Sequence, residues 1–157
     1  MRNNKESALA ARAYAFLLLK YRQRSVKEIS GRLRKKKFSE EIIKETLDFL
    51  REKKFIDDPG FARAWIKERL VRGIGPRRLF QELKLKGIDK QVIESHLSQA
   101  KEYYSETETI RSLAERRFNS LKDLDQQTAK RRVYAFLLRR GFSPDAVIDT
   151  VNQYDNS

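Results

Sequence analysis

The sequence predicts an all-α protein: three tandem three-helix repeats that form an elongated, curved, solenoid-like chain. Apolar residues recur at three- and four-residue spacing through the 157 residues, and no run alternates apolar and polar in the manner of a strand. Only three prolines and six glycines interrupt this pattern. Helix caps and apolar positions also return after about fifty residues, which is typical of stacked helical repeats.

The first predicted repeat covers residues 1–55. Its first helix is marked by the apolar residues Leu9, Ala13, Phe16, Leu17 and Tyr21. Ser25 caps the second helix, and Glu28 stands three residues later as the partner in a capping box. Ser39 caps the third helix, which carries apolar residues on one face.

The second predicted repeat covers residues 56–104. The acidic pair and proline of Asp57–Pro59 open its first helix. The stretch Arg72–Ile88 contains the second helix, for which Gly75 suits the N-cap and Pro76 the first helical position. Gly87 ends that helix because glycine readily adopts the left-handed conformation.

The third predicted repeat covers residues 105–157. A break at Tyr103–Thr107 precedes a helix that contains Ile110–Phe118. A second helix runs over Gln126–Arg140 and stops at Gly141, and Ser143 opens the last helix together with the proline that follows it.

The repeats align at separations of 50 and 54 residues. One shared apolar position is occupied by Leu33, Leu83 and Leu137. One shared capping position is occupied by Ser39, Asp89 and Ser143. Lys37 departs from the pattern, since the other copies have Gly87 and Gly141 there. The alternative to a repeat array is one nine-helix bundle with chance self-similarity.

The composition is strongly basic, with a formal net charge of +13 and a sequence pI of about 10.1. This charge favours an anionic partner: nucleic acid, an acidic protein surface or a membrane surface. A basic protein with a merely solvated charged surface is the alternative. Residues 1–55 carry a net charge of +9, residues 56–104 carry +3 and residues 105–157 carry +1.

Basic residues recur at matching places in the repeats, and we expect them to form a stripe that contacts the partner. The candidates are Arg32, Arg34, Lys35, Lys36 and Lys37 in the first repeat, Arg72, Arg77, Arg78, Lys84 and Lys86 in the second, and Arg131, Arg132, Arg139 and Arg140 in the third. Such contacts position a protein on phosphates without reading base sequence. The aromatic residues expected in the core, which weakens the case for base stacking, are Phe16, Trp65, Phe118 and Phe136.

No motif for catalysis, a metal or a cofactor is evident. Cysteine is absent, which excludes disulfides and thiolate chemistry and suits the cytoplasm. His96 is the single histidine and is expected to be a surface or interface residue, while Asp57 and Asp58 are better explained as helix caps than as metal ligands. No apolar run reaches the roughly 18 residues of a membrane span, and the N-terminus lacks a signal-peptide cleavage pattern. An enzyme would need a cluster of carboxylates or histidines that the repeats do not provide.

The order and spacing of several short motifs resemble those of the RecX family of bacterial recombination regulators. In the second repeat they are Asp57-Asp58, Phe61-Ala62-Arg63, the run from Arg72 to Leu79, Glu82-Leu83 and Lys86-Gly87-Ile88. In the first repeat they are Ala8-Leu9, Arg24-Ser25, Glu28-Ile29, Leu33, Phe38, Leu47 and Leu50. The resemblance extends over residues 7–154.

The resemblance implies a non-enzymatic, cytoplasmic inhibitor of the RecA recombinase that acts as a monomer in DNA repair and the SOS response. Its partners would be the RecA filament, single-stranded DNA and duplex DNA as a further ligand, without a membrane. Lying in the filament groove, it would block filament growth, ATP hydrolysis and strand exchange. The alternative is a stand-alone helical module that binds duplex DNA with sequence preference.

Overall fold

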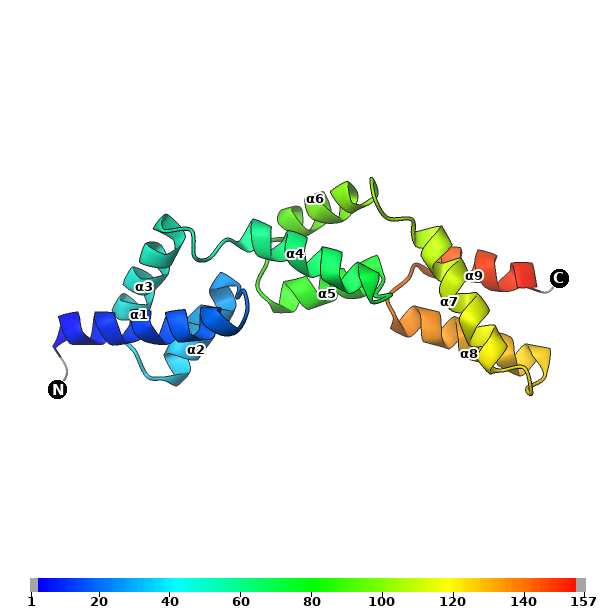
Figure 1. Cartoon of the computed structure of the whole chain (residues 1–157), viewed down its shortest axis with the longest axis horizontal. Helices are drawn as coiled ribbons and strands as arrows, with labels where there is room; N and C mark the ends of the chain where they lie inside the picture. The colour runs from blue at the N-terminus through cyan, green and yellow to red at the C-terminus, as the bar shows by residue number, and fades with distance from the viewer. Residues whose placement is uncertain (1–2, 155–157) are drawn as a thin grey trace. The chain divides into compact units, whose positions relative to one another are not determined.

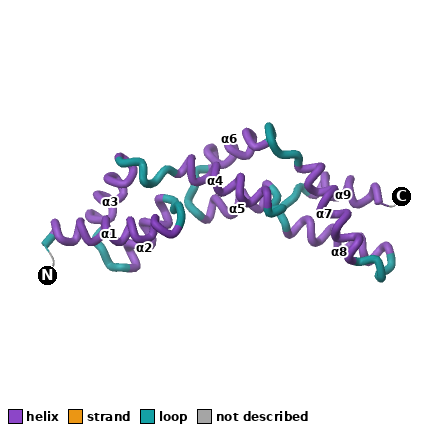
Figure 2. Tube along the Cα trace, viewed as in Figure 1, coloured by secondary structure: helices purple, strands orange, loops and turns teal. Residues whose placement is uncertain are grey.

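The structure, a computed structural model, describes residues 3–154 and contains nine helices and no strand within them (Figures 1 and 2). The helices are α1 (Asn4–Tyr21), α2 (Val26–Lys35), α3 (Glu40–Glu52), α4 (Asp58–Val71), α5 (Pro76–Leu85), α6 (Lys90–Ala100), α7 (Glu106–Ser120), α8 (Gln126–Arg139) and α9 (Pro144–Gln153). The predicted all-α repeat fold is confirmed, whereas the elongated, curved shape stays a prediction. None of the helices in this range is long and apolar enough to span a membrane.

The chain divides into two compact units. Unit 1 comprises Met1–Ala64 and Leu83–Val92, and unit 2 comprises Trp65–Glu82 and Ile93–Ser157. The second predicted repeat contributes residues to both units, so the division into domains at residues 55 and 104 stays a prediction. Residues 1–2 and 155–157 of the predicted first and third repeats lie outside the described part.

The helices begin at the polar caps that the sequence predicts. Ser25 forms a complete capping box with Glu28, and Asp89 accepts a hydrogen bond of 2.8 Å from the Gln91 amide through Oδ1. The predicted break at Tyr103–Thr107 extends too far, because its last two residues are already helical. Ser105 caps α7, whose first helical residue is Glu106, because the Ser105 side chain accepts a hydrogen bond from the backbone amide of the third helical residue.

The core positions shared by the repeats are buried. Leu33, Leu83 and Leu137 are each 0% exposed. In unit 1, α1, α2 and α3 enclose a core that includes Ala11, Ala15, Leu18, Ile29, Leu33, Ile43 and Leu50. In unit 2, α7, α8 and α9 enclose a core that includes Ile110, Ala114, Val133, Leu137, Phe142, Val147 and Val151. The register derived from the sequence therefore identifies the buried positions.

The apolar face predicted for α1 is largely wrong. Leu9, Leu17 and Tyr21 are 59%, 52% and 79% exposed, whereas Ala11 and Ala15 are fully buried. A helix that is apolar on several sides has no single stripe from which its buried face follows. Small alanine side chains allow α1 to pack closely in the unit 1 core. The face of α1 that carries them is therefore the buried one.

The aromatic residues predicted for the core are only partly buried. Phe16 is 36% exposed and makes edge-to-face contacts with Phe49 and Phe55, at ring-centroid distances of 6.3 and 4.9 Å. Trp65, Phe118 and Phe136 are also only partly buried. Aromatic rings therefore lie at the edges of both units, where charged side chains are near them.

Candidate functional site

In unit 1, the start of α2 packs against the turn that follows α5, and we call this contact the first junction. Ser25 Oγ donates a hydrogen bond of 2.7 Å to the carbonyl oxygen of Lys86. A Cβ atom on Gly87 would lie 2.6 Å from Cβ of Lys27, so a larger residue would force the two segments apart. Asp58 at the start of α4 accepts a hydrogen bond of 2.9 Å from the Val26 amide.

Glu28 neutralises the positive charge at the first junction. Its carboxylate pairs with Arg22, with Arg24 at 3.9 Å and with Lys86 at 3.3 Å. Burial alone raises the pKa of Glu28, but hydrogen bonds from Arg22 and the Ser25 amide, with the charges of Arg22 and Lys86, bring the pKa below its ordinary value. Lys86, a predicted contact residue, is therefore engaged inside unit 1.

In unit 2, the start of α5 packs against the turn that follows α8, and we call this contact the second junction. The Gly75 amide donates a hydrogen bond of 2.6 Å to the Arg140 carbonyl, and the Arg77 amide donates one of 2.9 Å to the Gly141 carbonyl. Gly75 and Arg140 are the repeat equivalents of Ser25 and Lys86. Both junctions therefore join the start of a helix to the equivalent turn, through the Ser25 hydroxyl in the first and the Gly75 amide in the second.

The two junctions carry side chains of opposite charge at one equivalent position. Arg78 stands in the second junction where the first has Glu28. A pocket of about 520 Å³ lies there, lined by Arg69, Arg72, Ile74, Arg78, Phe136, Arg139 and Arg140. Nη1 of Arg140 donates a hydrogen bond of 3.1 Å to the Arg72 carbonyl, which fixes the guanidinium at the pocket wall.

Acidic residues balance only part of this charge. Glu82 pairs with Arg69 at 2.6 Å and Arg78 at 3.3 Å, and Glu68 pairs with Arg72 at 3.0 Å. Burial raises the pKa of Glu82, but hydrogen bonds from Arg69 and the Trp65 indole, with the charges of Arg69 and Arg78, leave the pKa below its ordinary value.

Arg139 and Arg140 have no such acidic partner. In the described part of the chain, neither side chain forms an ion pair with a carboxylate. Their charge is therefore left for an external anion.

A second pocket extends the positive surface along α8. It has a volume of about 380 Å³ and is lined by Arg117, Thr128, Arg131, Arg132, Ala135 and Arg139. Arg139 lines both pockets, and Phe136 lies beneath the guanidinium groups of Arg117 and Arg140, each 5.1 Å from the ring centroid. The arginine cluster of unit 2 is therefore Arg69, Arg72, Arg78, Arg117, Arg131, Arg132, Arg139 and Arg140.

The cluster brings together six of the residues predicted from the sequence and adds two that were missed. Arg69 and Arg117 were not among the residues predicted from the sequence. What identifies them is their place in the pockets, since Arg69 on α4 and Arg117 on α7 line these pockets together with residues of α8.

The other predicted contact residues do not join this cluster. Arg32, Lys35, Lys36 and Lys37 lie exposed at the end of α2 in unit 1. Arg34 forms two hydrogen bonds with Glu40, at 2.6 and 3.1 Å. Arg77 and Lys84 are exposed and line neither of the two arginine pockets. A continuous basic stripe through all three repeats stays a prediction.

No group of three or more histidine, cysteine, aspartate or glutamate residues suited to a metal ion occurs within residues 3–154. His96 is half-buried on α6, and its Nδ1 makes no hydrogen bond to the described residues. The arginine cluster itself, with its shared pockets and the Arg140 guanidinium held against the Arg72 carbonyl, suits binding of an anion.

Comparison with known proteins finds three consecutive matches along the chain. Family models described as the first, second and third three-helix domains of RecX match residues 11–50, 57–97 and 105–150. A crystal structure of RecX from Lactobacillus salivarius shares the fold, with a TM-score of 0.82 and 23% sequence identity. The match covers 98% of this chain and 99% of that one.

Several curated relatives carry the name "Regulatory protein RecX". The protein of Clostridium botulinum (strain Eklund 17B / Type B) is 30% identical over 155 residues, which cover 98% of this chain and 72% of the relative. That of Amycolatopsis mediterranei (strain U-32) is 34% identical, over 90% of this chain and 80% of the relative. That of Bacillus licheniformis is 36% identical over 87% of this chain, but the match spans only 52% of the relative's length. The chain belongs to the RecX family of regulatory proteins.

Proposed function

We propose that the chain inhibits the RecA recombinase by binding in the groove of the RecA–single-stranded-DNA filament, where it blocks filament growth, ATP hydrolysis and strand exchange. Membership of a family of regulatory proteins supports a regulatory and non-enzymatic role. Acting as a monomer in the cytoplasm, the protein would contact acidic surfaces of RecA and phosphates of the DNA.

One observation carries this proposal: the second junction has an arginine where the first has a neutralising glutamate. Glu28 satisfies three cations within unit 1. Arg78 adds positive charge at the equivalent place, and Arg139 and Arg140 beside it pair with no carboxylate among the described residues. Concentrated charge of this kind attracts a polyanion and accelerates its association.

The proposal is tested by RecA-dependent ATP hydrolysis on single-stranded DNA, measured with increasing amounts of the purified protein. Inhibition is expected near stoichiometric amounts, and Arg139→Glu is expected to weaken it about tenfold, equivalent to about 1.4 kcal/mol. Arg139 is suited to the test because its side chain is exposed and makes no ion pair in the described part.

Lys44→Glu is the matched control, since Lys44 is exposed on α3 and the substitution changes the net charge equally. It is expected to leave inhibition unchanged. Absence of any effect of the unmodified protein on ATP hydrolysis would refute the proposal.

The second candidate function is a stand-alone module that binds duplex DNA. Arg139 and Arg140, which form no ion pair in the described part of the chain, also favour it, because phosphates of any nucleic acid fit such a surface. It predicts tight, sequence-dependent binding to a duplex without RecA. Binding to duplex DNA that shows no sequence preference, together with inhibition of RecA, would favour the first function.

A further inference from the structure

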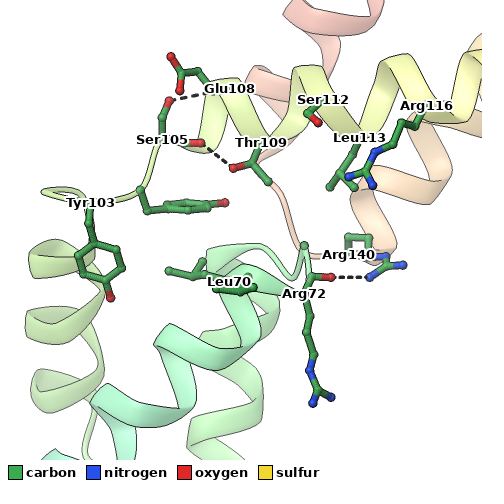
Figure 3. A pocket seen from close by; sticks show the side chains of 13 residues that line it. Leu70, Arg72, Tyr103, Ser105, Glu108, Thr109, Ser112, Leu113, Arg116 and Arg140 are labelled. Carbon is green, nitrogen blue, oxygen red and sulfur yellow. Dashed lines mark hydrogen bonds between the residues drawn. The ribbon is translucent and has the colours of Figure 1, made fainter.

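A third pocket of unit 2 combines an aromatic wall with an arginine wall (Figure 3). It has a volume of about 560 Å³, within the range of sites that hold a small ligand. The loop between α6 and α7 provides Tyr103 and Tyr104, α7 provides Arg116, and the end of α8 provides Arg140. We call this site the Tyr103 pocket.

The arginine wall is held ready for an anion. Figure 3 shows Arg116 and Arg140 on the same side of the pocket, with Arg140 fixed by its hydrogen bond to the Arg72 carbonyl. Neither arginine pairs with a carboxylate in the described part of the chain. The Arg72 side chain points away from α7 and pairs with Glu68, so it does not compete for the site.

The aromatic wall includes the ring of Tyr103, which is largely exposed to solvent. Tyr103 is 59% exposed and lies across the pocket from Arg116 and Arg140, with the buried Leu70 between them (Figure 3). Burial raises the pKa of the Tyr104 hydroxyl to about 12, although Thr109 opposes part of the rise, so this group stays protonated. The Thr109 hydroxyl itself donates to the Ser105 carbonyl at 2.8 Å, and the buried Tyr104 hydroxyl oxygen makes no hydrogen bond of good geometry in the described part.

We propose that the Tyr103 pocket takes a short segment of a single-stranded nucleic acid: one base stacks on Tyr103, and Arg116 and Arg140 bind phosphates farther along the strand. An exposed aromatic ring beside arginines is the arrangement that binds unpaired bases without sequence preference. A base inside a duplex is already stacked and does not reach such a ring. The inference deepens the proposed function and rests on it, because it assigns the DNA contact to unit 2.

The neighbouring pockets favour a nucleic acid over an acidic peptide. Arg140 lines both the Tyr103 pocket and the pocket at the second junction, and Arg139 continues the positive surface to the pocket along α8. A series of arginine sites that share residues suits a chain of regularly spaced phosphates. An acidic peptide has no need of an exposed aromatic ring at one end of that series.

The experiment compares two labelled strands of equal length by fluorescence anisotropy: an oligothymidylate and an abasic strand that keeps only sugar and phosphate. The full chain is expected to bind the oligothymidylate more tightly. Tyr103→Ala should weaken oligothymidylate binding about five- to tenfold, the equivalent of one stacked base, and leave the abasic strand unaffected. Tyr103→Phe should restore the binding, because the ring and not the hydroxyl stacks.

The phosphate contact is tested separately with Arg116→Gln. This substitution is expected to weaken binding of both strands alike and to reduce the slope of log K against log salt concentration by about one. Tyr21→Ala is the matched control, since Tyr21 is 79% exposed on α1 of unit 1, and should change nothing. Circular dichroism verifies that each variant is folded.

Three results would overturn the inference: equal affinity of the unmodified protein for both strands, no effect of Tyr103→Ala, or equal weakening of both strands by Tyr103→Ala. Displacement of the labelled oligothymidylate by poly-glutamate, but not by an unlabelled abasic strand, would likewise assign the pocket to an acidic protein partner. The RecA-dependent ATP hydrolysis assay distinguishes the two proposals. If the protein inhibits hydrolysis while the strand comparison fails, the proposed function stands and the nucleotide site is refuted.

Discussion

Glu82 makes the stability of unit 2 depend on pH. Its pKa lies below its ordinary value of 4.5, because the bonds and charges of Arg69, Trp65 and Arg78 outweigh burial. A carboxylate with a lowered pKa stabilises the folded state fully above its unfolded pKa, and this contribution is lost as the pH falls through the folded pKa. Glu82→Gln should therefore cost about 2 kcal/mol at pH 7 and progressively less as the pH falls below 4.5.

Urea unfolding of the two proteins at pH 7, 5 and 3 measures this difference. Glu41→Gln serves as the control because Glu41 is exposed on α3 and should show no comparable trend. A difference between Glu82→Gln and the unmodified protein that stays constant from pH 7 to pH 3 would show that the charge of Glu82 is not its cause.

Lys37 is held in a conformation that favours glycine. Its φ of 63° lies in the left-handed region, as do the φ values of 80° at Gly87 and 93° at Gly141. The left-handed conformation destabilises a residue with a Cβ atom by about 1 kcal/mol. Lys37→Gly should therefore raise the free energy of unfolding by about that amount. Lys35→Gly, inside the last turn of α2, should lower it by about 0.5–1 kcal/mol. Thermal or urea unfolding checks the opposite signs, and a loss of stability in both variants would contradict the assignment.

At the scale of elements, the junctions explain which turns require glycine. Cβ atoms on Gly87 and Gly141 would collide with Lys27 and Arg78, at 2.6 and 2.3 Å. Backbone conformation alone permits lysine, as position 37 demonstrates. The sequence predicted the same turn in all three repeats, but it did not reveal that two of these turns are also contact surfaces for a neighbouring helix.

Gly75 is the most restrictive position of the second junction. A Cβ atom there would lie 2.5 Å from both the carbonyl carbon and the carbonyl oxygen of Gly141, and backbone atoms have little freedom to move. Gly75→Ala should therefore destabilise the protein by about 1–3 kcal/mol. Gly31→Ala is the control, because a Cβ on Gly31 meets nothing within 4 Å inside α2, and it should stabilise by about 0.5–1 kcal/mol. Unfolding curves that show the same shift for both variants would contradict the close contact.

The helices and their caps were predictable because they depend on residues close together in the sequence. Which face of a helix is buried, and which residues meet in a pocket, depend on tertiary packing. Ser25 and Asp89 act within a few residues of their own positions, so a single sequence reveals them. The buried face of α1 depends on Ala11 and Ala15, whose size matters only against another helix. Tyr103 and Arg116 are 13 residues apart in the sequence, and only the fold places them around one pocket.

For the whole molecule, net charge is a poor guide to where a partner binds. Residues 1–55 carry a net charge of +9 and residues 105–157 only +1. Yet Arg34 and Arg22 in the first segment are paired with Glu40 and Glu28, while arginines of the last segment line shared pockets with few acidic neighbours. A polyanion responds to the local arrangement of unpaired charges at distances below the Debye length of about 8–10 Å.

Two double substitutions separate local arrangement from total charge. Arg131→Glu with Arg139→Glu removes charge from the arginine cluster, and Lys35→Glu with Lys36→Glu removes the same amount from the exposed end of α2. If net charge governed binding of single-stranded DNA, both pairs would weaken it equally at every salt concentration. We expect the substitutions in the cluster to weaken binding about tenfold more, because they remove about two direct phosphate contacts and not only long-range attraction. Affinity measured from 50 to 200 mM salt checks this, and equal losses would assign binding to the molecule's overall field.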